Sequence, residues 1–500
     1  MTTAALPHHL RDVLNYEVDK LLVQLGGGVI DSVTYDTSWV VRLQPYFPYA
    51  GFEGAIHWLR HRQSPDGSWG GDVLYHHDRF ICTLAAMVAL HTVGHDIDRP
   101  RVQQAENFLW RTYNYLSRDP HDTIGFPVLA VSLLNEATQL GLDVPSDLYC
   151  DVATIEKKLN MVGRVSSAWR YNTMSFSLEA AHPKYPEEPN FLEANGSVGT
   201  SPAATAAMLI RRGREYTPSL NYLRNIANPD GGIPNVGPID TFEIAWSLNL
   251  LRLAGAITPD DPEVKRATDA LWDAWSQEKG IGFSSFYSLS DLDDTATTFA
   301  VLRWAGYPAS ADVFLRFEVD DHFLCFPAEA DPSLGAHVRA LMAIRMAPEH
   351  PKYEAWIEKM LHLIRRYNLY GRFYFDKWHS SPYYMRSTAI YALHNLENPL
   401  ATECIHWMIR TQLEDGGWGY YGKSTAEETA YCLQALLYWE HYFPGTCSPA
   451  HIEAAAVFLS DNLQDERFPS LWIGKCLYTP PKVVQAAIAA ALHSYRVWKG

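Results

Sequence analysis

The sequence predicts an all-α protein, and three observations support this fold class. Apolar residues recur at the three- and four-residue spacing of one helix face, in segments of about 10 to 15 residues. Proline, glycine, aspartate or asparagine separates these segments, as is typical of helix ends and turns. The strict alternation of apolar and polar residues that marks a half-buried strand is almost absent. We therefore expect helices joined by short connections.

Four segments show the helical spacing most clearly, and they are spread over the chain. They are residues 80–90, 242–251, 353–364 and 483–492. Each carries Leu, Ile, Val, Ala or aromatic side chains at helical spacing. Such a face must be buried against another helix, so each segment predicts a packed helix rather than an isolated one.

A repeated motif lies in the connections between predicted helices. Residues 63–70 and 412–419 share Gln, Asp-Gly and Trp-Gly at the same offsets, and each follows a segment that contains a tryptophan, Trp58 or Trp407. A weaker copy lies at residues 228–232. Asp-Gly favours a tight turn, a Gln at a helix end can bond nearby backbone, and the Trp can pack over the next helix. The motif is structural and predicts helical hairpins that bury their apolar faces on their neighbours.

Length and composition limit the function. A chain of 500 residues exceeds what one core usually supports, so we expect two domains of roughly 200 to 250 residues. With 47% hydrophobic and 13% aromatic residues, it can fill large cores and still line a cavity with rings. A formal net charge of −16 argues against nucleic acid as a partner. An anionic ligand would have to be bound by a few local cations.

Cysteine usage and hydropathy indicate a cytoplasmic protein. The odd number of cysteines and the absence of a Cys-x-x-Cys pair predict neither a disulfide framework nor a thiolate metal site. We find no basic-then-apolar signal at the start and no run of about 18 uncharged apolar residues, so no integral membrane segment is expected. Contact with a membrane surface is left open. The seven cysteines are Cys82, Cys150, Cys325, Cys404, Cys432, Cys447 and Cys476.

The most informative stretch places three carboxylates in four positions. Asp291, Asp293 and Asp294 precede the apolar run 295–302. Mutual repulsion and partial burial raise at least one pKa in such a group, which leaves a neutral carboxylic acid that can donate its proton near pH 7. The alternative is an acidic first helical turn without catalytic use, since Asp is favoured there by the helix dipole.

The repeats and the Asp-x-Asp-Asp stretch together resemble the terpene cyclases that act by protonation, namely squalene-hopene cyclases and class II diterpene cyclases. Further blocks narrow the resemblance to class II diterpene cyclases, especially the short bacterial members. They lie at residues 32–40, 196–205, 231–235, 376–379 and 471–478. The resemblance covers nearly the whole chain.

The resemblance implies a fold of two α/α-barrel domains, called β and γ, with the active site between them. On this basis residues 1–28 form the first helix of the β domain, residues 29–249 form an inserted γ domain, and residues 250–500 complete the β domain with the acidic stretch. Spacing alone does not define these boundaries.

The resemblance also implies the reaction, which is bicyclisation of geranylgeranyl diphosphate with the diphosphate retained. A carbon–carbon double bond is a very weak base, so the acid must be desolvated and hydrogen-bonded. Asp293 would be the proton donor, and Asp291 and Asp294 would hold and polarise it. His337 matches a histidine that hydrogen-bonds the acid in relatives; the alternative is a histidine of the core or cavity rim.

Two residues are expected to control the product. Phe176 occupies the position where copalyl-forming plant relatives carry a histidine that helps to remove the final proton, whereas Asn235 is retained. Phenylalanine cannot accept a proton, so the bicyclic cation should live longer and hydride and methyl shifts should compete. A clerodane product such as kolavenyl diphosphate is therefore expected. Halimadienyl or copalyl diphosphate is the alternative, since another group can serve as base.

The resemblance further implies that Lys158 and Lys475 meet the diphosphate and that Mg2+ bridges its oxygens. Residues 320–324 and 260–264 lack the closing Asp of the metal-binding motif that class I synthases use to ionise a diphosphate. A separate class I terpene synthase or a phosphatase would therefore act on the product.

Two other function classes compete with this hypothesis. One is a triterpene cyclase of the hopene type, which the length and the few well-formed repeats disfavour. The other is a noncatalytic or zinc-dependent helical barrel, such as a prenyltransferase subunit or binding module. Loss of cyclisation in Asp293→Ala and analysis for zinc would separate these classes.

Overall fold

The computed structural model describes residues 10–145, 169–180, 190–327, 329, 332–369, 371 and 375–500. The α-helices in these residues are α1 (Leu10–Gln24), α2 (Thr34–Val41), α3 (Glu53–His61), α4 (His76–Val93), α5 (Arg99–Thr112), α6 (Phe126–Gln139), α8 (Pro202–Arg212), α9 (Thr217–Ile226), α10 (Asp240–Leu253), α11 (Pro262–Ala274), α12 (Leu292–Trp304), α13 (Leu334–Ile344), α14 (Tyr353–Leu369), α15 (Pro382–Leu393), α16 (Asn398–Thr411), α17 (Ala426–Tyr442), α18 (Pro449–Asp461) and α19 (Pro481–Lys499). Short 3-10 helices are η1 (Asp96–Asp98), η2 (Tyr113–Arg118), η3 (Trp169–Tyr171), η4 (Thr173–Ala180) and η5 (Ala311–Arg316). The strands in the described part of the chain are β1 (Ser32–Val33), β2 (Ile233–Pro234), β3 (Trp472–Ile473) and β4 (Leu477–Tyr478). The predicted all-α class is confirmed, and each of the four segments singled out in the sequence lies within a helix.

Side-chain caps explain where several helices begin. The hydroxyl of Ser201 accepts a hydrogen bond from the first turn of α8, and Ser333 does the same for α13. Ser381 caps α15, and Thr425 caps α17. These oxygens satisfy backbone N–H groups that would otherwise lack partners, so the local sequence determines the start of each helix.

The two full copies of the repeat adopt the same hydrogen-bond pattern. Gln63 donates to two backbone carbonyls, one in its own turn and one in α5, at 3.1 and 3.0 Å. Gln412 donates equivalently within its turn and to α18, at 2.7 and 2.9 Å. The ring N–H groups of Trp69 and Trp418 donate to the preceding helices at 2.7 and 2.8 Å. The predicted structural role is thus confirmed: the motif joins consecutive helical hairpins.

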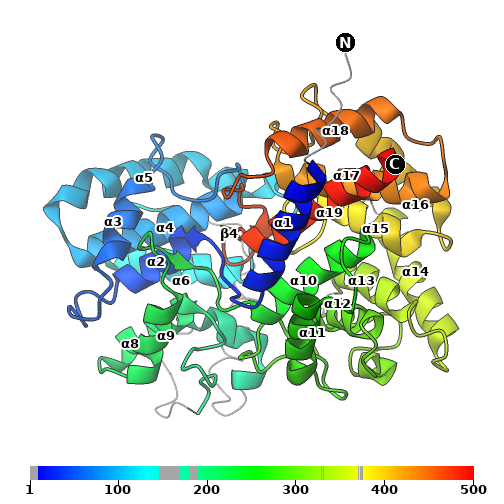
Figure 1. Ribbon diagram of the computed structural model, residues 1–500. Helices are drawn as coiled ribbons and strands as arrows, with labels where there is room; N and C mark the ends of the chain where they lie inside the picture. The colour runs from blue at the N-terminus through cyan, green and yellow to red at the C-terminus, as the bar shows by residue number, and fades with distance from the viewer. Residues whose placement is uncertain are drawn as a thin grey trace.

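The buried apolar residues form two large clusters. One cluster runs from Val33 to Ile233 and includes Cys476. The other joins residues 14–30 to residues 236–495. We call the corresponding parts of the molecule the smaller lobe and the larger lobe. Figure 1 shows them side by side, with α1 lying beside α19 in the larger lobe, where the two helices are in contact.

The partition of the core differs from the predicted boundary at residue 249. Helix α10 belongs to the larger cluster and packs against α12 and α19. Its residues from Thr241 to Leu248 are buried on all sides, because the helix lies inside the larger lobe rather than at its edge. The division into β and γ α-barrel domains stays a prediction.

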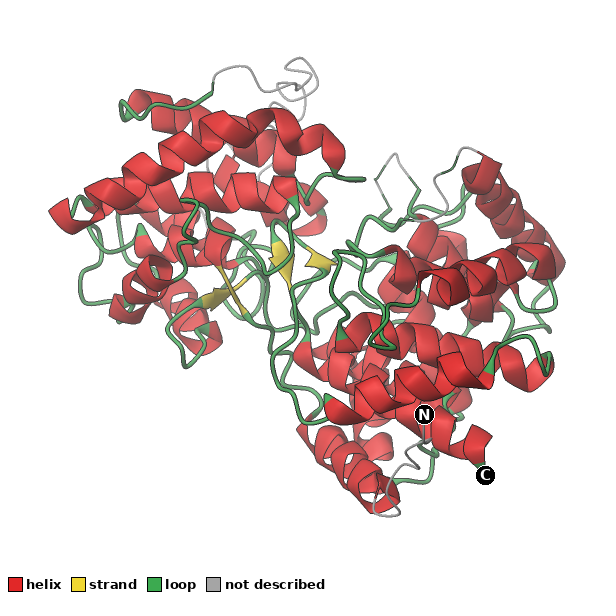
Figure 2. Ribbon diagram, turned by 90° about the horizontal axis from the view of Figure 1, so that it is seen from above, coloured by secondary structure: helices red, strands yellow, loops and turns green. Residues whose placement is uncertain are grey.

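A short hairpin formed by β3 and β4 lies where the two lobes meet (Figure 2). Its Trp472 belongs to the core of the larger lobe and its Cys476 to that of the smaller lobe. The backbone N–H of Leu477 donates to Asp78 of α4 at 2.8 Å. The hairpin therefore connects both lobes through packing and through hydrogen bonds. Within the described residues, no helix has the length and apolar character needed to cross a bilayer.

Candidate active site

A cavity of about 890 Å3, including its mouth, opens between the two lobes. The smaller-lobe wall consists of Ile124, Thr173, Phe176 and Asn235. The larger-lobe wall carries the three aspartates of the acidic stretch among apolar and aromatic side chains. The other described residues that line the cavity are Val236, Ile239, Phe242, Trp246, Phe283, Tyr287, Asp291, Asp293, Asp294, Phe326, Trp378, Trp472, Ile473, Gly474 and Tyr478.

The start of α12 positions the three aspartates. Asp291 is the N-cap, and its Oδ1 accepts a hydrogen bond from the backbone N–H of Asp294 at 2.8 Å. Asp293 and Asp294 therefore lie in the first turn of the helix, and all three side chains are buried at the cavity wall. The acidic turn is therefore buried at a cavity, and Asp291 also has the capping role that the alternative interpretation assigned to this stretch.

The pKa values of all three carboxyl groups are raised, as expected from the sequence. Burial raises the pKa of Asp293 to about 6 and that of Asp291 to about 7. The pKa of Asp294 is raised well above its ordinary value, first by burial and then by the charge of Asp291. The main cause is thus desolvation rather than crowding. A buried carboxyl group at the cavity wall can be neutral near pH 7 and can donate a proton.

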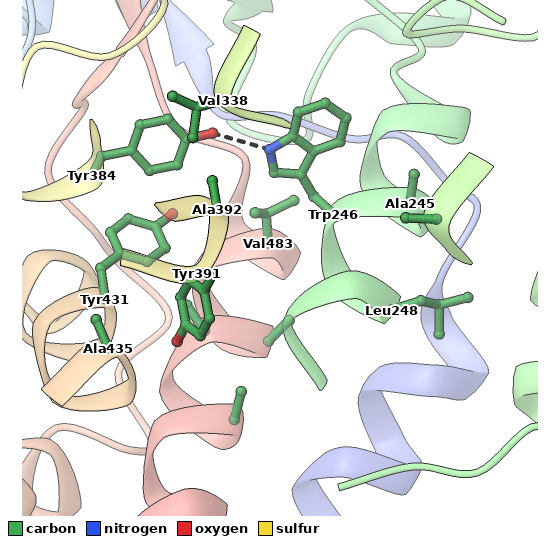
Figure 3. Packing of buried hydrophobic residues seen from close by; sticks show 14 of the residues in the cluster. Ala245, Trp246, Leu248, Val338, Tyr384, Tyr391, Ala392, Tyr431, Ala435 and Val483 are labelled. Carbon is green, nitrogen blue, oxygen red and sulfur yellow. Dashed lines mark hydrogen bonds between the residues drawn. The ribbon is translucent and has the colours of Figure 1, made fainter. Parts of the chain in front are cut away.

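Arg339, on α13, is the partner of Asp293. Its Nη1 donates to Asp293 Oδ1 at 2.8 Å, and its Nη2 donates to the hydroxyl of Tyr384. The ring N–H of Trp246 donates to the same hydroxyl at 3.1 Å, as Figure 3 shows. The positive charge of Arg339 lowers the pKa of Asp293, although burial outweighs it. Sequence reasoning missed Arg339; an arginine inside the apolar segment 334–344 was the available signal.

The prediction that His337 hydrogen-bonds the acid is wrong. Its Nδ1 lies 2.6 Å from the carbonyl of Ser333, and its Nε2 accepts a hydrogen bond from the backbone N–H of Phe323 at 2.9 Å. Both ring nitrogens are therefore occupied by backbone groups. Burial lowers the pKa of His337 to about 4, which favours this neutral, structural state. Two residues further along the helix, Arg339 contacts the acid instead.

A fourth buried carboxylate, Asp376, lies close to this group. Its charge raises the pKa of both Asp293 and Arg339. Neither of its oxygens has a hydrogen-bond partner among the described residues. A Cβ atom at Gly335 would lie 2.3 Å from its Oδ2, so only glycine allows the start of α13 to approach this carboxylate.

Phe176 and Asn235 reach the same cavity from the smaller lobe. The side-chain amide of Asn235 is held at both ends: its Nδ2 donates to Asp36 at 2.8 Å, and its Oδ1 accepts from the backbone N–H of Lys475 at 3.3 Å. Burial raises the pKa of Asp36 to about 7, while the charge of Lys475 opposes that rise. The structure thus brings both predicted product-control residues to the cavity that contains Asp293.

The prediction that Lys475 binds a diphosphate is wrong. Its side chain is fully buried, and its Nζ donates to Glu179 and to Ser201, each at 2.6 Å. The amine also lies 4.6 Å from the ring centre of Phe176, behind the cavity wall. A lysine engaged in this way stabilises the junction of the lobes and has no free charge for a ligand. Lys158 lies outside the described residues.

The described residues contain one group that could ligate a metal ion, formed by Asp78, Cys82 and Cys476. Mg2+ requires oxygen ligands, and two of these three side chains are thiols. The oxygens of Asp78 already accept backbone hydrogen bonds from Gly71 and Leu477 at 2.7 and 2.8 Å. This group does not fit Mg2+.

Comparison with known proteins agrees with the geometry of the cavity. None of the protein-family sequence models matches the chain. A type B diterpene cyclase of Mycobacterium tuberculosis is 36% identical over 493 residues, which cover 94% of this chain and 96% of that protein. An ent-copalyl diphosphate synthase of Streptomyces sp. is 30% identical over 503 residues, covering 95% and 94% of the two chains.

A solved structure gives the same result for the fold. The ent-copalyl diphosphate synthase from Streptomyces platensis superposes with a TM-score of 0.77 at 28% identity and covers 97% of this chain and 100% of its own. These relatives favour a diterpene cyclase over the hopene-type and zinc-dependent alternatives. The chain is an enzyme that belongs to the class II diterpene cyclases.

Proposed function

We propose that this enzyme converts geranylgeranyl diphosphate into a bicyclic diphosphate and that Asp293 donates the initiating proton. The observation that supports this most strongly is a carboxyl group that is buried, lines the cavity and has a pKa of about 6. Because its pKa is raised, a larger fraction of this carboxyl group still carries its proton near neutral pH than would be the case for a carboxyl group in water.

The hydrogen bonds of Asp293 suggest which oxygen carries the proton. Oδ1 accepts from Arg339 at 2.8 Å and so cannot also carry a proton toward that donor. The proton is therefore expected on Oδ2, which is the oxygen left for the cavity. Arg339 orients the acid in this way, and Asp291 holds the first turn of α12 in place through its bond to Asp294. Transfer of the proton to the terminal double bond leaves Asp293 ionised and paired with Arg339.

The surrounding rings protect the cation that results. Phe242, Trp246, Trp472 and Tyr478 belong to the cavity wall, so the reacting carbons face aromatic side chains rather than water. Aromatic faces attract positive charge, and exclusion of water prevents early capture of the cation. Two rings can then close before the cation is lost.

Phe176 supports a rearranged product. A phenyl ring at the cavity wall cannot take up a proton, and both ends of the nearby Asn235 amide are engaged by Asp36 and the Lys475 backbone. A bicyclic cation without a strong base beside it has time for hydride and methyl shifts. We infer kolavenyl diphosphate, a clerodane, as the product. Halimadienyl or copalyl diphosphate is the alternative.

The carbon–oxygen bond of the diphosphate is not broken in this reaction, so Mg2+ is proposed only to bind the diphosphate oxygens of the substrate. No step of the mechanism passes through the ion. The retained diphosphate must later be removed, and a class I terpene synthase or a phosphatase is proposed as the enzyme that consumes the product.

The test is incubation of the purified enzyme with geranylgeranyl diphosphate, followed by dephosphorylation and identification of the alcohol by mass spectrometry and NMR. Parallel reactions with and without a chelator test the need for Mg2+. A bicyclic alcohol is the expected result. Recovery of linear geranylgeraniol alone would reject the proposed activity, whereas copalol would retain the bicyclisation and reject the rearrangement.

A further inference from the structure

Tryptophan side chains line the cavity at three positions among the described residues, and their surroundings differ. They are Trp246, Trp378 and Trp472. Tryptophan has the strongest attraction for a cation among the aromatic side chains, and this attraction grows when water is excluded. The three rings would attract a cation equally strongly only if their immediate neighbours carried similar charges.

Trp246 and Trp378 each have a protein cation beside them. The guanidinium carbon of Arg339 lies 5.1 Å from the ring centre of Trp246. The amine of Lys377 lies 4.9 Å from the ring centre of Trp378. The indole N–H of Trp378 has no hydrogen-bond partner among the residues that the structure describes. A nearby cation competes with a carbocation for the ring and repels it.

Trp472 has the opposite surroundings, because its indole N–H donates to a buried carboxylate. The acceptor is Glu427 Oε1, at 2.7 Å. Glu427 lies on α17 and is completely buried. The same oxygen accepts a hydrogen bond from the hydroxyl of Tyr431 at 3.0 Å and lies 3.2 Å from Nε2 of His379.

The hydrogen bonds of His379 identify it as a third donor to Glu427. Its Nδ1 accepts from the backbone N–H of Ser381 at 3.1 Å, so the proton of the neutral ring is on Nε2, which faces Glu427. Three donors thus converge on one carboxylate oxygen. Hydrogen bonds of this kind stabilise the charged form of a carboxylate.

An anion behind the indole changes what the ring can do. Donation of the N–H to a carboxylate increases the electron density of the ring, and the negative charge also attracts a cation on the far side of the ring. Trp472 lies at the acid end of the cavity: its ring centre is 4.9 Å from that of Tyr384, whose hydroxyl accepts from Arg339, the partner of Asp293. A cation formed by Asp293 therefore arises in the cavity that this ring lines.

We propose that Glu427 makes Trp472 the principal site of carbocation stabilisation in this cavity. Glu427 is a positioning residue that acts through Trp472 and does not touch the substrate. The proposal rests on the proposed cyclase function. It adds that Glu427, which does not reach the reacting carbons, determines through Trp472 how long the cation survives.

The main test compares Glu427→Gln with the wild-type enzyme. Glutamine keeps the shape and an acceptor oxygen but removes the charge. We expect about tenfold weaker binding of a prenyl diphosphate analogue with an ammonium centre, which mimics the cation. Binding of an uncharged analogue of equal length should be unchanged. With geranylgeranyl diphosphate, kcat should fall with little change in KM, and the share of unrearranged and water-captured products should rise.

A double-mutant cycle shows whether Glu427 acts through Trp472. The loss of ammonium-analogue binding in Trp472→Phe should not grow when Glu427→Gln is added, because the ring that transmits the charge is already gone. The matched pair, Trp246→Phe with and without Glu427→Gln, should give additive losses. Additivity at Trp472, or a larger effect of Trp246→Phe than of Trp472→Phe, would overturn the proposal.

A second measurement avoids any loss of folding in the Glu427 variant. Fluorinated tryptophans placed singly at positions 472, 246 and 378 withdraw electrons from the ring without changing its packing much. Affinity for the ammonium analogue should fall with each added fluorine, and the fall per fluorine should be largest at Trp472. A fall at Trp472 that is equal to or smaller than the fall at Trp246 or Trp378 would reject the inference. An inactive wild-type enzyme would instead reject the proposed function, so the two failures are distinguishable.

Discussion

The larger-lobe wall and the smaller-lobe wall of the cavity both contain buried carboxylates paired with one cation, but they present different groups to the substrate. In the larger lobe, Asp293 itself lines the cavity and its cation, Arg339, holds it from behind. In the smaller lobe, Asp36 and Glu179 lie behind the wall with Lys475, and only Phe176 and Asn235 reach the cavity.

This difference explains how one cavity can start a cationic reaction and then allow it to continue. A carboxyl group at the surface of the cavity can exchange a proton with the substrate. Carboxylates that are shielded by a ring and an amide cannot, although their negative charge still acts across the wall. The larger-lobe wall is therefore suited to protonating the substrate. The smaller-lobe wall offers no base, so it is suited to delaying the loss of the final proton from the cation.

Removal of the acid is the largest expected effect. In Asp293→Asn, the side chain keeps its size and can still bond Arg339 but has no proton to donate. We expect the rate of cyclisation to fall by about 100- to 10,000-fold, as measured by product formation at saturating substrate. Asp36→Asn, a matched change in the smaller lobe, should retain most of the activity. Near wild-type turnover in Asp293→Asn would show that another group starts the reaction.

The second effect concerns stability. Lys475→Met leaves Glu179 as a buried charge without its cation, and we expect the free energy of unfolding to fall by about 3 to 5 kcal/mol. The control is Lys352→Met, which removes an exposed partner of Glu318 and should cost about 1 kcal/mol or less. Denaturant titration measures both variants. If Lys475→Met instead weakened substrate binding without loss of stability, the diphosphate role would be restored.

The third effect is on pH dependence. Asp293 must be protonated to act, and its pKa is raised to about 6, so the rate should be highest below pH 6 and should fall as the pH rises through that value. Because Arg339 lowers the pKa of Asp293, Arg339→Gln should move the falling limb upward by about one pH unit or more. The measurement is kcat against pH for both enzymes. A limb that stays in place would mean that a different group controls the profile.

The smallest effect on rate, but a clear effect on product, is expected for Phe176→His. The new imidazole would lie near the amine of Lys475, whose charge favours the neutral ring that can accept a proton. The larger-lobe wall is untouched, so the overall rate should change little. The product should move toward copalyl diphosphate, which gas chromatography of the dephosphorylated alcohols would detect. Phe176→Leu, which adds no base, should keep the rearranged product.

Local features of this molecule could be predicted from the sequence. The helices over residues 80–90 and 483–492 depend on apolar spacing, which is a property of neighbouring residues. The turns that contain Asp66 and Asp415 depend on an Asp-Gly pair, and in both the aspartate accepts a hydrogen bond from the backbone two residues later. The raised pKa of Asp293 follows from its place in the first turn of an apolar helix, since such a helix begins in the protein interior.

The partners of the buried charges could not be predicted, because they are far apart in the sequence. Lys475 pairs with Glu179 across 296 positions, and Asp293 pairs with Arg339 across 46. A lysine between Gly474 and Cys476 looks the same in the sequence whether its amine binds a ligand or a buried glutamate. His337 and Arg339 stand two residues apart on one helix, so only the rotation of α13 decides which of them meets the acid.

The β3–β4 hairpin has a consequence for how the enzyme is made. Residues 472–478 supply Trp472 and Tyr478 to the cavity, Lys475 to Glu179 and a backbone donor to Asp78. During synthesis on a ribosome, the first 470 residues are joined before any of these groups exists. Until this late segment has been made, Glu179 lacks its cation and the cavity lacks part of its wall, so the chamber is complete only after the hairpin has packed between the lobes.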